Sequence, residues 1–264
     1  MISKTDFASD DLGANELTRF LSSYSAYLLG SGATCIRLEK NVRRIAQTYG
    51  WDVELAIMPR HVHISVWKEG QPGVVTCIAA VNHNVISFNV NTRLSELSWE
   101  IADQKIDFQT ACDKFDKIIH SDFQSRWLVM FLVVLANASF CRLFGGDVIA
   151  MGIVSAATLA GYYLKLLLLG RGVDVRVMMM ACSFVSAILG ASGQLFGLGS
   201  TPAVALGTSV LYLVPGIPFI NSFSDMLYRH YLCAFSRFAD AVVLTCSLSI
   251  GLCAAMLIMN AGMF

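Results

Sequence analysis

The fold of this chain is decided by residues 177–224, which read VMMMACSFVSAILGASGQLFGLGSTPAVALGTSVLYLVPGIPFINSFS. None of these 48 residues is Asp, Glu, Lys or Arg. A helix that crosses a bilayer needs about 20 apolar residues, so the stretch can supply two such helices. The sequence Gly197-Leu-Gly-Ser-Thr-Pro202 is typical of the turn between them. The stretch therefore predicts a membrane protein rather than a soluble enzyme.

The charged residues divide the 264-residue chain into two parts. Residues 1–126 hold 13 of the 19 Lys and Arg and 15 of the 19 Asp and Glu, which leaves 6 and 4 for residues 127–264. Over the whole chain 14% of residues are charged, whereas an ordinary soluble domain has roughly 25%. We therefore predict a cytoplasmic α+β domain over residues 1–125, followed by a transmembrane helical bundle over residues 126–264.

Five transmembrane helices are expected in the second part. They are placed at about residues 127–144, 148–169, 177–197, 203–222 and 239–260. If the N-terminal domain is inside the cell, the outer turns hold Arg142 alone, and the inner edges hold the other basic residues, Arg126, Lys165, Arg171, Arg176, Arg229 and Arg237. The excess of basic residues on the inner side predicts a cytoplasmic N-terminus and a C-terminus outside.

The N-terminal part combines two hydrophobic periodicities. Apolar residues at helical spacing predict helices over residues 15–29, 34–49, 91–104 and 107–119, with Gly50 ending the second. Three runs rich in β-branched residues, at 52–58, 61–67 and 74–79, predict a small antiparallel meander.

The most informative motif is Leu213-Val-Pro-Gly-Ile-Pro-Phe-Ile-Asn-Ser-Phe-Ser-Asp225. Pro215 and Pro218 flank Gly216, and prolines remove backbone donors, so the fourth helix should break here. A break at membrane depth is tolerated where protein or a water-filled cavity satisfies the freed groups. If a second half-helix starts near Pro218, its N–H groups could hold a carboxylate, with Asn221 and Asp225 one turn apart below the break. The alternative is a packing kink with Asp225 solvated at the inner interface.

Two charged residues lie in the turn predicted at the outer end of the first helical hairpin, Arg142 and Asp147. Arg142 could bind an anionic substrate there, or it could reach the lipid headgroups instead.

The sequence offers little for catalysis, cofactors or nucleic acid. His61 and His63 share a strand face, but no third ligand accompanies them, so no metal site is predicted. Nucleophile, P-loop and metalloprotease motifs are lacking, and no cofactor is expected. The formal net charge is zero and no basic run occurs, which argues against nucleic-acid binding.

These features together resemble the threonine/serine exporter family, specifically its N-terminal half. The resemblance covers about residues 15–255. It rests on Gly32-Ala-Thr34 with Arg37 and Glu39, on Asn91-Thr-Arg93, on Phe144-Gly-Gly-Asp147, and above all on Val214-Pro-Gly-Ile-Pro-Phe-Ile-Asn221 with Asp225.

The resemblance implies a secondary transporter subunit that exports threonine and serine, or succinate in the split systems. It also implies a separate small hydrophobic membrane subunit that supplies the second half, and spacings of small residues suggest a bundle or an oligomer. Substrate contacts would fall at Pro215, Gly216, Pro218, Asn221, Asp225, Arg142 and Asp147.

Gly32, Thr34, Arg37 and Glu39 would serve gating or docking in the cytoplasmic domain. Equally, Thr34 could simply cap the second helix while Arg37 pairs with an acidic neighbour. A different class of function also remains open, in which the N-terminal domain is a sensor or assembly module and the membrane helices only anchor it.

Overall fold

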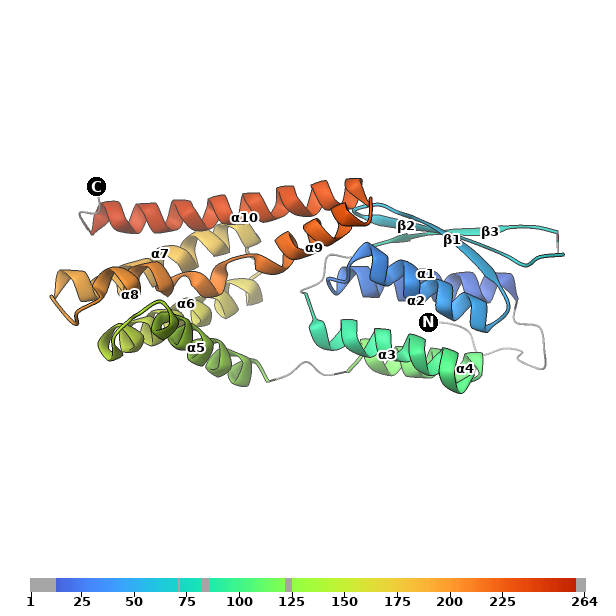
Figure 1. The fold of residues 1–264 in the computed structure, drawn as a ribbon, viewed down its shortest axis with the longest axis horizontal. Helices are drawn as coiled ribbons and strands as arrows, with labels where there is room; N and C mark the ends of the chain where they lie inside the picture. The colour runs from blue at the N-terminus through green and yellow to red at the C-terminus, as the bar shows by residue number, and fades with distance from the viewer. Residues whose placement is uncertain (1–12, 71, 82–85, 122–124, 260–264) are drawn as a thin grey trace. The chain divides into compact units, whose positions relative to one another are not determined.

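The computed structural model describes residues 13–70, 72–81, 86–121 and 125–259. Its helices and strands form two compact units (Figure 1). The first contains the chain up to Ser121 together with Ile220–Arg237, and the second contains Asp122–Phe219 together with Phe238 onwards. We call residues 220–237 the α9–α10 hairpin.

The first unit is an α+β domain. Its helices are α1 (Ala14–Gly30), α2 (Cys35–Thr48), α3 (Phe88–Gln104) and α4 (Phe108–Ile119). Its strands are β1 (Asp52–Ile57), β2 (His61–Trp67) and β3 (Val75–Ala80), and they form an antiparallel sheet in the order β1-β2-β3. Asp52 pairs with Trp67 and His61 with Ala80 at the two ends of the ladders. The predicted helices and meander are confirmed, with boundaries shifted by up to three residues.

Alternating burial explains how this sheet packs. Val62, Ile64 and Val66 of β2 are buried, while the residues between them are exposed or half-buried, so one face of the sheet is apolar. Helices α1 and α2 cover this face, and α3 and α4 form a further layer on them (Figure 1). Tyr24 of α1 is fully buried between these layers and donates a hydrogen bond to the carbonyl of Leu94 at 2.8 Å.

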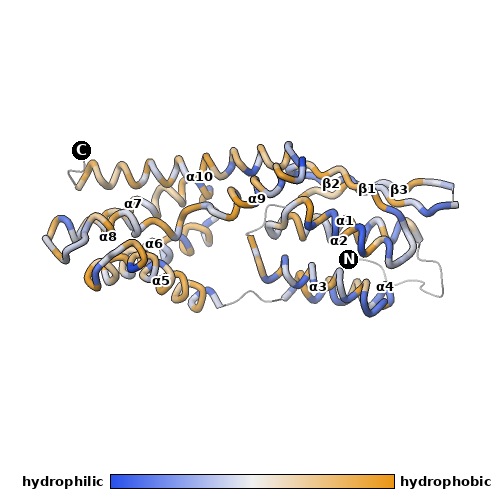
Figure 2. Tube along the Cα trace, viewed as in Figure 1, coloured by the Kyte–Doolittle hydropathy of each residue, from blue (hydrophilic) through white to orange (hydrophobic). Residues whose placement is uncertain are grey.

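The second unit is built from apolar helices. Figure 2 shows the change from mixed hydropathy in α1–α4 to predominantly hydrophobic residues in α5–α8 and α10. The elements are α5 (Arg126–Leu143), α6 (Val148–Gly170), α7 (Val175–Leu195), α8 (Pro202–Ser209) and a 3₁₀ turn η1 (Leu211–Leu213). Helices α9 (Gly216–Leu227) and α10 (Tyr231–Ile258) each begin in one unit and end in the other.

Among the described residues, four helices are long and apolar enough to cross a membrane, and a fifth crossing is counted if the bent pair α8–η1 and α9 is one span. The expected fourth helix, 203–222, is interrupted between Leu213 and Gly216, where the two segments bend by 61°. Pro218 lies in the first turn of α9, as its fixed φ favours. The expected last helix, 239–260, instead starts at Tyr231, because the helix continues beyond its apolar part.

Close helix packing in the second unit depends on glycines at three helix crossings. A Cβ on Gly161 of α6 would overlap the hydroxyls of Tyr212 and Ser186, and one on Gly251 of α10 would overlap Ser183 and the Met180 carbonyl of α7. A Cβ on Gly190 of α7 would likewise overlap the hydroxyl of Ser209. Small residues therefore set how closely these helices approach, as in many membrane bundles.

Candidate functional site

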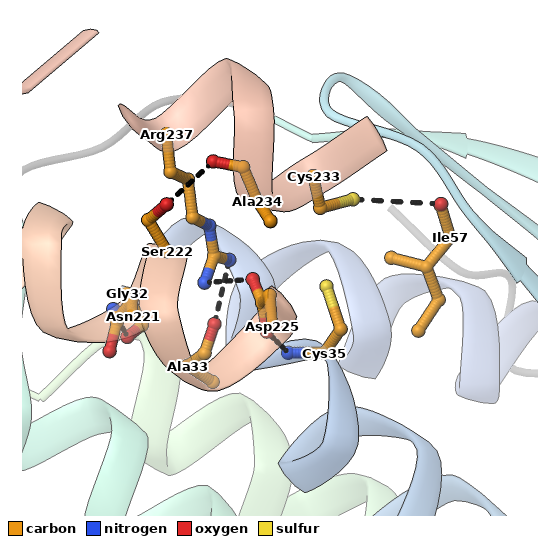
Figure 3. A network of polar contacts seen from close by, with 10 residues as sticks. All are labelled: Gly32, Ala33, Cys35, Ile57, Asn221, Ser222, Asp225, Cys233, Ala234 and Arg237. Atoms are coloured by element: carbon orange, nitrogen blue, oxygen red, sulfur yellow. Dashed lines mark hydrogen bonds and ion pairs between the residues drawn. The ribbon is translucent and has the colours of Figure 1, made fainter. Parts of the chain in front are cut away.

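The site forms where the loop between α1 and α2 contacts the α9–α10 hairpin, within the first unit (Figure 3). Asp225 of α9 has no solvent-exposed surface. Its Oδ1 accepts a hydrogen bond from the backbone N–H of Cys35 at 2.8 Å, and its Oδ2 forms an ion pair with Nη1 of Arg237 at 2.9 Å. Cys35 is the first residue of α2, so Asp225 places a negative charge at the positive end of that helix.

Two further side chains bind the carbonyls of the same loop. Asn221 donates from Nδ2 to the carbonyl of Gly32 at 2.8 Å, and Arg237 donates from Nη2 to the carbonyl of Ala33 at 2.8 Å. Gly32 has φ = +93°, a left-handed conformation that favours glycine, and a Cβ there would lie 2.9 Å from Ile86. We call this set of contacts, between residues 32–35 and Asn221, Asp225 and Arg237, the joint.

Polar and sulfur contacts surround the joint. His230 lies 3.7 Å from Glu39 of α2, which also pairs with Arg43 at 3.0 Å. The thiols of Cys35 and Cys233 interact, and this hydrogen bond together with burial raises the pKa of Cys35. Cys233 is buried, and its Sγ lies 3.6 Å from the carbonyl of Ile57.

The structure contradicts two simple roles predicted for motif residues, helix capping by Thr34 and an ion pair made by Arg37. Thr34 occupies the N-cap position of α2, but its side chain makes no capping hydrogen bond, and the N–H of Cys35 donates to Asp225. Among the residues that the structure describes, Arg37 forms no ion pair with an acidic side chain; it donates to Oδ1 of Asn91 at 2.9 Å. Because Asn91 also belongs to a motif, the α2–α3 contact unites two motifs from distant parts of the sequence.

Asp147 and Arg142 both contact the turns at one end of the second unit. Asp147 caps α6 by accepting the N–H of Ala150 at 2.6 Å, and its other oxygen accepts the backbone N–H of Ser200 at 2.6 Å. These backbone hydrogen bonds hold the pKa of Asp147 below its usual value. Arg142 donates to the carbonyl of Gly146 at 3.2 Å, within its own turn.

The interruption near Pro215 and Gly216 adjoins a polar region inside the second unit. Asn137 of α5 donates to Oγ1 of Thr158 at 2.7 Å and to the carbonyl of Thr208 at 3.1 Å. The hydroxyls of Ser186 and Tyr212 lie 2.9 Å apart. Buried amide and hydroxyl groups thus connect α5, α6 and α7 to the segment that precedes the break.

Two hollows lie away from these residues. One, of about 460 Å³, has an apolar lining from α5 and α6 that includes Trp127 and Tyr163. The other, of about 180 Å³, lies between α3 and α4 beside the Lys114–Glu100 ion pair. Among the described residues, no group of three or more His, Cys, Asp or Glu could hold a metal ion.

The structure thus brings together Gly32, Asn221 and Asp225, which the sequence assigned to separate gating and substrate sites. Glu39 lies beside this group of residues, and its carboxylate is 3.7 Å from the ring of His230 in the α9–α10 hairpin. Sequence reasoning missed Arg237 as a partner of Asp225. The available signal was its position among the few charged residues after residue 126, twelve residues beyond Asp225.

Comparison with known proteins covers almost the whole chain. A family model described as "Putative threonine/serine exporter" matches residues 19–259. The "Probable succinate transporter subunit YjjP" of Klebsiella aerogenes is 29% identical over 245 residues, covering 91% of this chain and 93% of the relative. The protein of the same name from Escherichia coli strain K12 is 28% identical over 247 residues, covering 92% and 94%. No solved structure matches.

Proposed function

Because the chain belongs to the threonine/serine exporter family, whose model matches residues 19–259, we propose that it is one subunit of a secondary transporter that exports a small hydrophilic metabolite. The observation that carries the proposal is similarity over nine tenths of the chain to proteins named as transporter subunits. The names of those relatives favour succinate as cargo, and the family description favours threonine and serine. The word "subunit" in their names supports a separate membrane partner for this chain.

A parity argument supports five membrane crossings. Residues up to Ser121 and residues 220–237 belong to the same compact unit, so we place them on the same side of the membrane. Helices α5, α6 and α7 cross three times and leave the chain on the opposite side. Residues 202–219 must then return it, and 18 residues are enough for a bilayer core. We therefore propose that the bent pair α8–η1 and α9 is one broken span rather than a re-entrant loop.

The break is the proposed place of substrate contact. Pro215, Gly216 and Pro218 leave backbone groups near the first turn of α9 free for a carboxylate or hydroxyl group. Asn137 and Tyr212 would supply polar contacts from the neighbouring interior. For Asn221 and Asp225 we propose a docking role, since their polar atoms already bind the loop before α2. Arg142 and Asp147 order the turns at the opposite face.

The orientation follows from the same topology. With five crossings, the basic residues Arg171, Arg229 and Arg237 fall on the side of the N-terminal domain. By the positive-inside rule we propose that this side is cytoplasmic and the C-terminus outside. The similarity to proteins of Klebsiella aerogenes and Escherichia coli favours the inner membrane of a bacterium.

The test is efflux from cells that lack endogenous exporters and express this chain with or without its small membrane partner. The cells are preloaded with labelled succinate, threonine or serine. Partner-dependent efflux of one of them supports the proposal and identifies the cargo. If no combination exports any of the three, the transporter proposal fails and the N-terminal domain becomes the functional part, as a sensor or assembly module.

A further inference from the structure

Helix α9 is a short rod with an irregular backbone position beside each end. At its start, Pro215 interrupts the backbone, and proline cannot donate the hydrogen bond that a continuous helix would need. At its end, Arg229 has φ = +65°, in the left-handed region that non-glycine residues seldom adopt. Helix α9, which lies between these two points, has 12 residues. Rotations at the two ends can therefore move α9 as a rigid body.

The joint holds the C-terminal part of this rod through polar contacts. Four of the residues drawn around Asp225 and Arg237 have small side chains: Ala33, Cys35, Cys233 and Ala234 (Figure 3). Small side chains bury little apolar area each, and hydrophobic stabilisation scales with that area. A buried ion pair fixes geometry, whereas its net stabilisation is small because desolvation offsets the attraction. Such a contact specifies one position of α9 without holding it strongly.

We propose that the joint is a releasable latch, through which the N-terminal domain sets the position of α9 during the transport cycle. The proposal rests on the proposed function. When the joint is closed, Asp225 occupies the N-terminus of α2 and Arg237 neutralises it. When the joint opens, α9 turns about Pro215 and Arg229, which changes access to the break at Gly216. Asp225 and Arg237 are thus positioning residues that act on the substrate path through α9.

Two native cysteines report the state of the joint. Cys35 and Cys233 are 0% and 2% exposed; Cys35 is the first residue of α2, and Cys233 belongs to the α9–α10 hairpin. A buried thiol reacts with N-ethylmaleimide only when the structure around it opens. The full chain, co-expressed with its membrane partner, is treated with the reagent in membrane vesicles, and modification of each cysteine is followed by mass spectrometry. Cys77 of β3, half-buried and outside the joint, is the internal control.

The first comparison needs no substrate. Asp225→Asn removes the charge that pairs with Arg237, and loss of one partner of a buried pair is costly, so modification of Cys35 and Cys233 should rise about tenfold or more. Asn221→Ala removes one hydrogen bond and should give a smaller rise, which provides a milder variant if Asp225→Asn disturbs folding. Modification of Cys77 should not change in either variant. Equal rates at Cys35 and Cys233 in wild type and both variants would overturn the latch.

The second comparison separates a moving latch from a fixed contact. During efflux of whichever labelled substrate is exported, the wild-type chain should show faster modification of Cys35 and Cys233 than without substrate. Measured efflux with unchanged modification rates would show that the joint stays closed, and would overturn the proposal while leaving the transporter function intact. If no substrate is exported, the proposed function fails, and the variants still decide whether the joint can open.

Discussion

Two acidic residues, Asp147 and Asp225, each bind the N-terminus of a helix. Asp147 and Asp225 are two of the four acidic residues after position 126. Each binds N–H groups at the start of a helix, but Asp147 caps its own helix α6, whereas Asp225 binds the first residue of α2, 190 residues away. A carboxylate satisfies free N–H groups and the helix dipole together. These roles account for both residues before any substrate is considered.

Asp147 should make stability depend on pH. Hydrogen bonds hold its pKa below the usual value, so its contribution is present above the unfolded carboxyl pKa of about 4 and is lost as pH falls through the lower folded value. We expect Asp147→Asn to lower the melting temperature in detergent at pH 7, with the difference from wild type shrinking as pH falls below about 4. Ser200→Ala, which keeps the backbone N–H, should lower it less. A difference that persists unchanged at low pH would contradict this account.

Helix contacts in the second unit depend on which helix positions are glycine, the residue without a side chain. Within α6, Gly161 lies against Tyr212 and Ser186, whereas Gly152 has no atom within 4 Å of the position that a Cβ would take. The two glycines share one helix and one kind of substitution. They differ only in what surrounds them, so they form a matched pair.

Gly161→Ala should destabilise the purified protein by about 1–3 kcal/mol, because the methyl group forces α6, α7 and η1 apart. Gly152→Ala should be neutral or stabilising by up to about 1 kcal/mol, since alanine favours the helix. Chemical denaturation in detergent, followed by circular dichroism, measures both. Equal effects of the two substitutions would show that α6 does not pack as described.

At the scale of the whole molecule, the chain leaves its first unit after Ser121, forms part of the second unit, and rejoins the first unit at residues 220–237. The α9–α10 hairpin supplies Asn221, Asp225 and Arg237 to an α+β unit that otherwise ends at Ser121. The predicted boundary at residues 125 and 126 does not include this return. That residues 220–237 belong to the first unit is also the basis of the parity argument for five crossings.

Cysteines introduced at three turns test the topology. With a membrane-impermeant maleimide on intact cells, Leu198→Cys in the α7–α8 turn should be labelled. Arg171→Cys and Tyr228→Cys should be labelled only after the cells are permeabilised, because the proposed topology places both turns on the side of the N-terminal domain. The unsubstituted chain controls for native thiols such as Cys246 and Cys253. Labelling of Tyr228→Cys from outside would show that residues 202–219 do not cross the membrane.

Local chemistry by itself determined much of this protein. Apolar runs of bilayer length, the strand-and-turn pattern of residues 52–80 and the helix break at Pro215 all follow from hydropathy, periodicity and proline geometry. These features depend on neighbours within a few residues, so the sequence displays them directly.

The tertiary structure alone decided which distant residues meet. Asn221, Asp225 and Arg237 contact residues 32–35 across about 190 positions of sequence, and nothing in a single sequence encodes pairs that far apart. For the same reason, the N-terminus of α2 is bound by the carboxylate of Asp225 rather than capped by the hydroxyl of Thr34. A fully buried charge must find a partner wherever the fold provides one, and here that partner is Arg237.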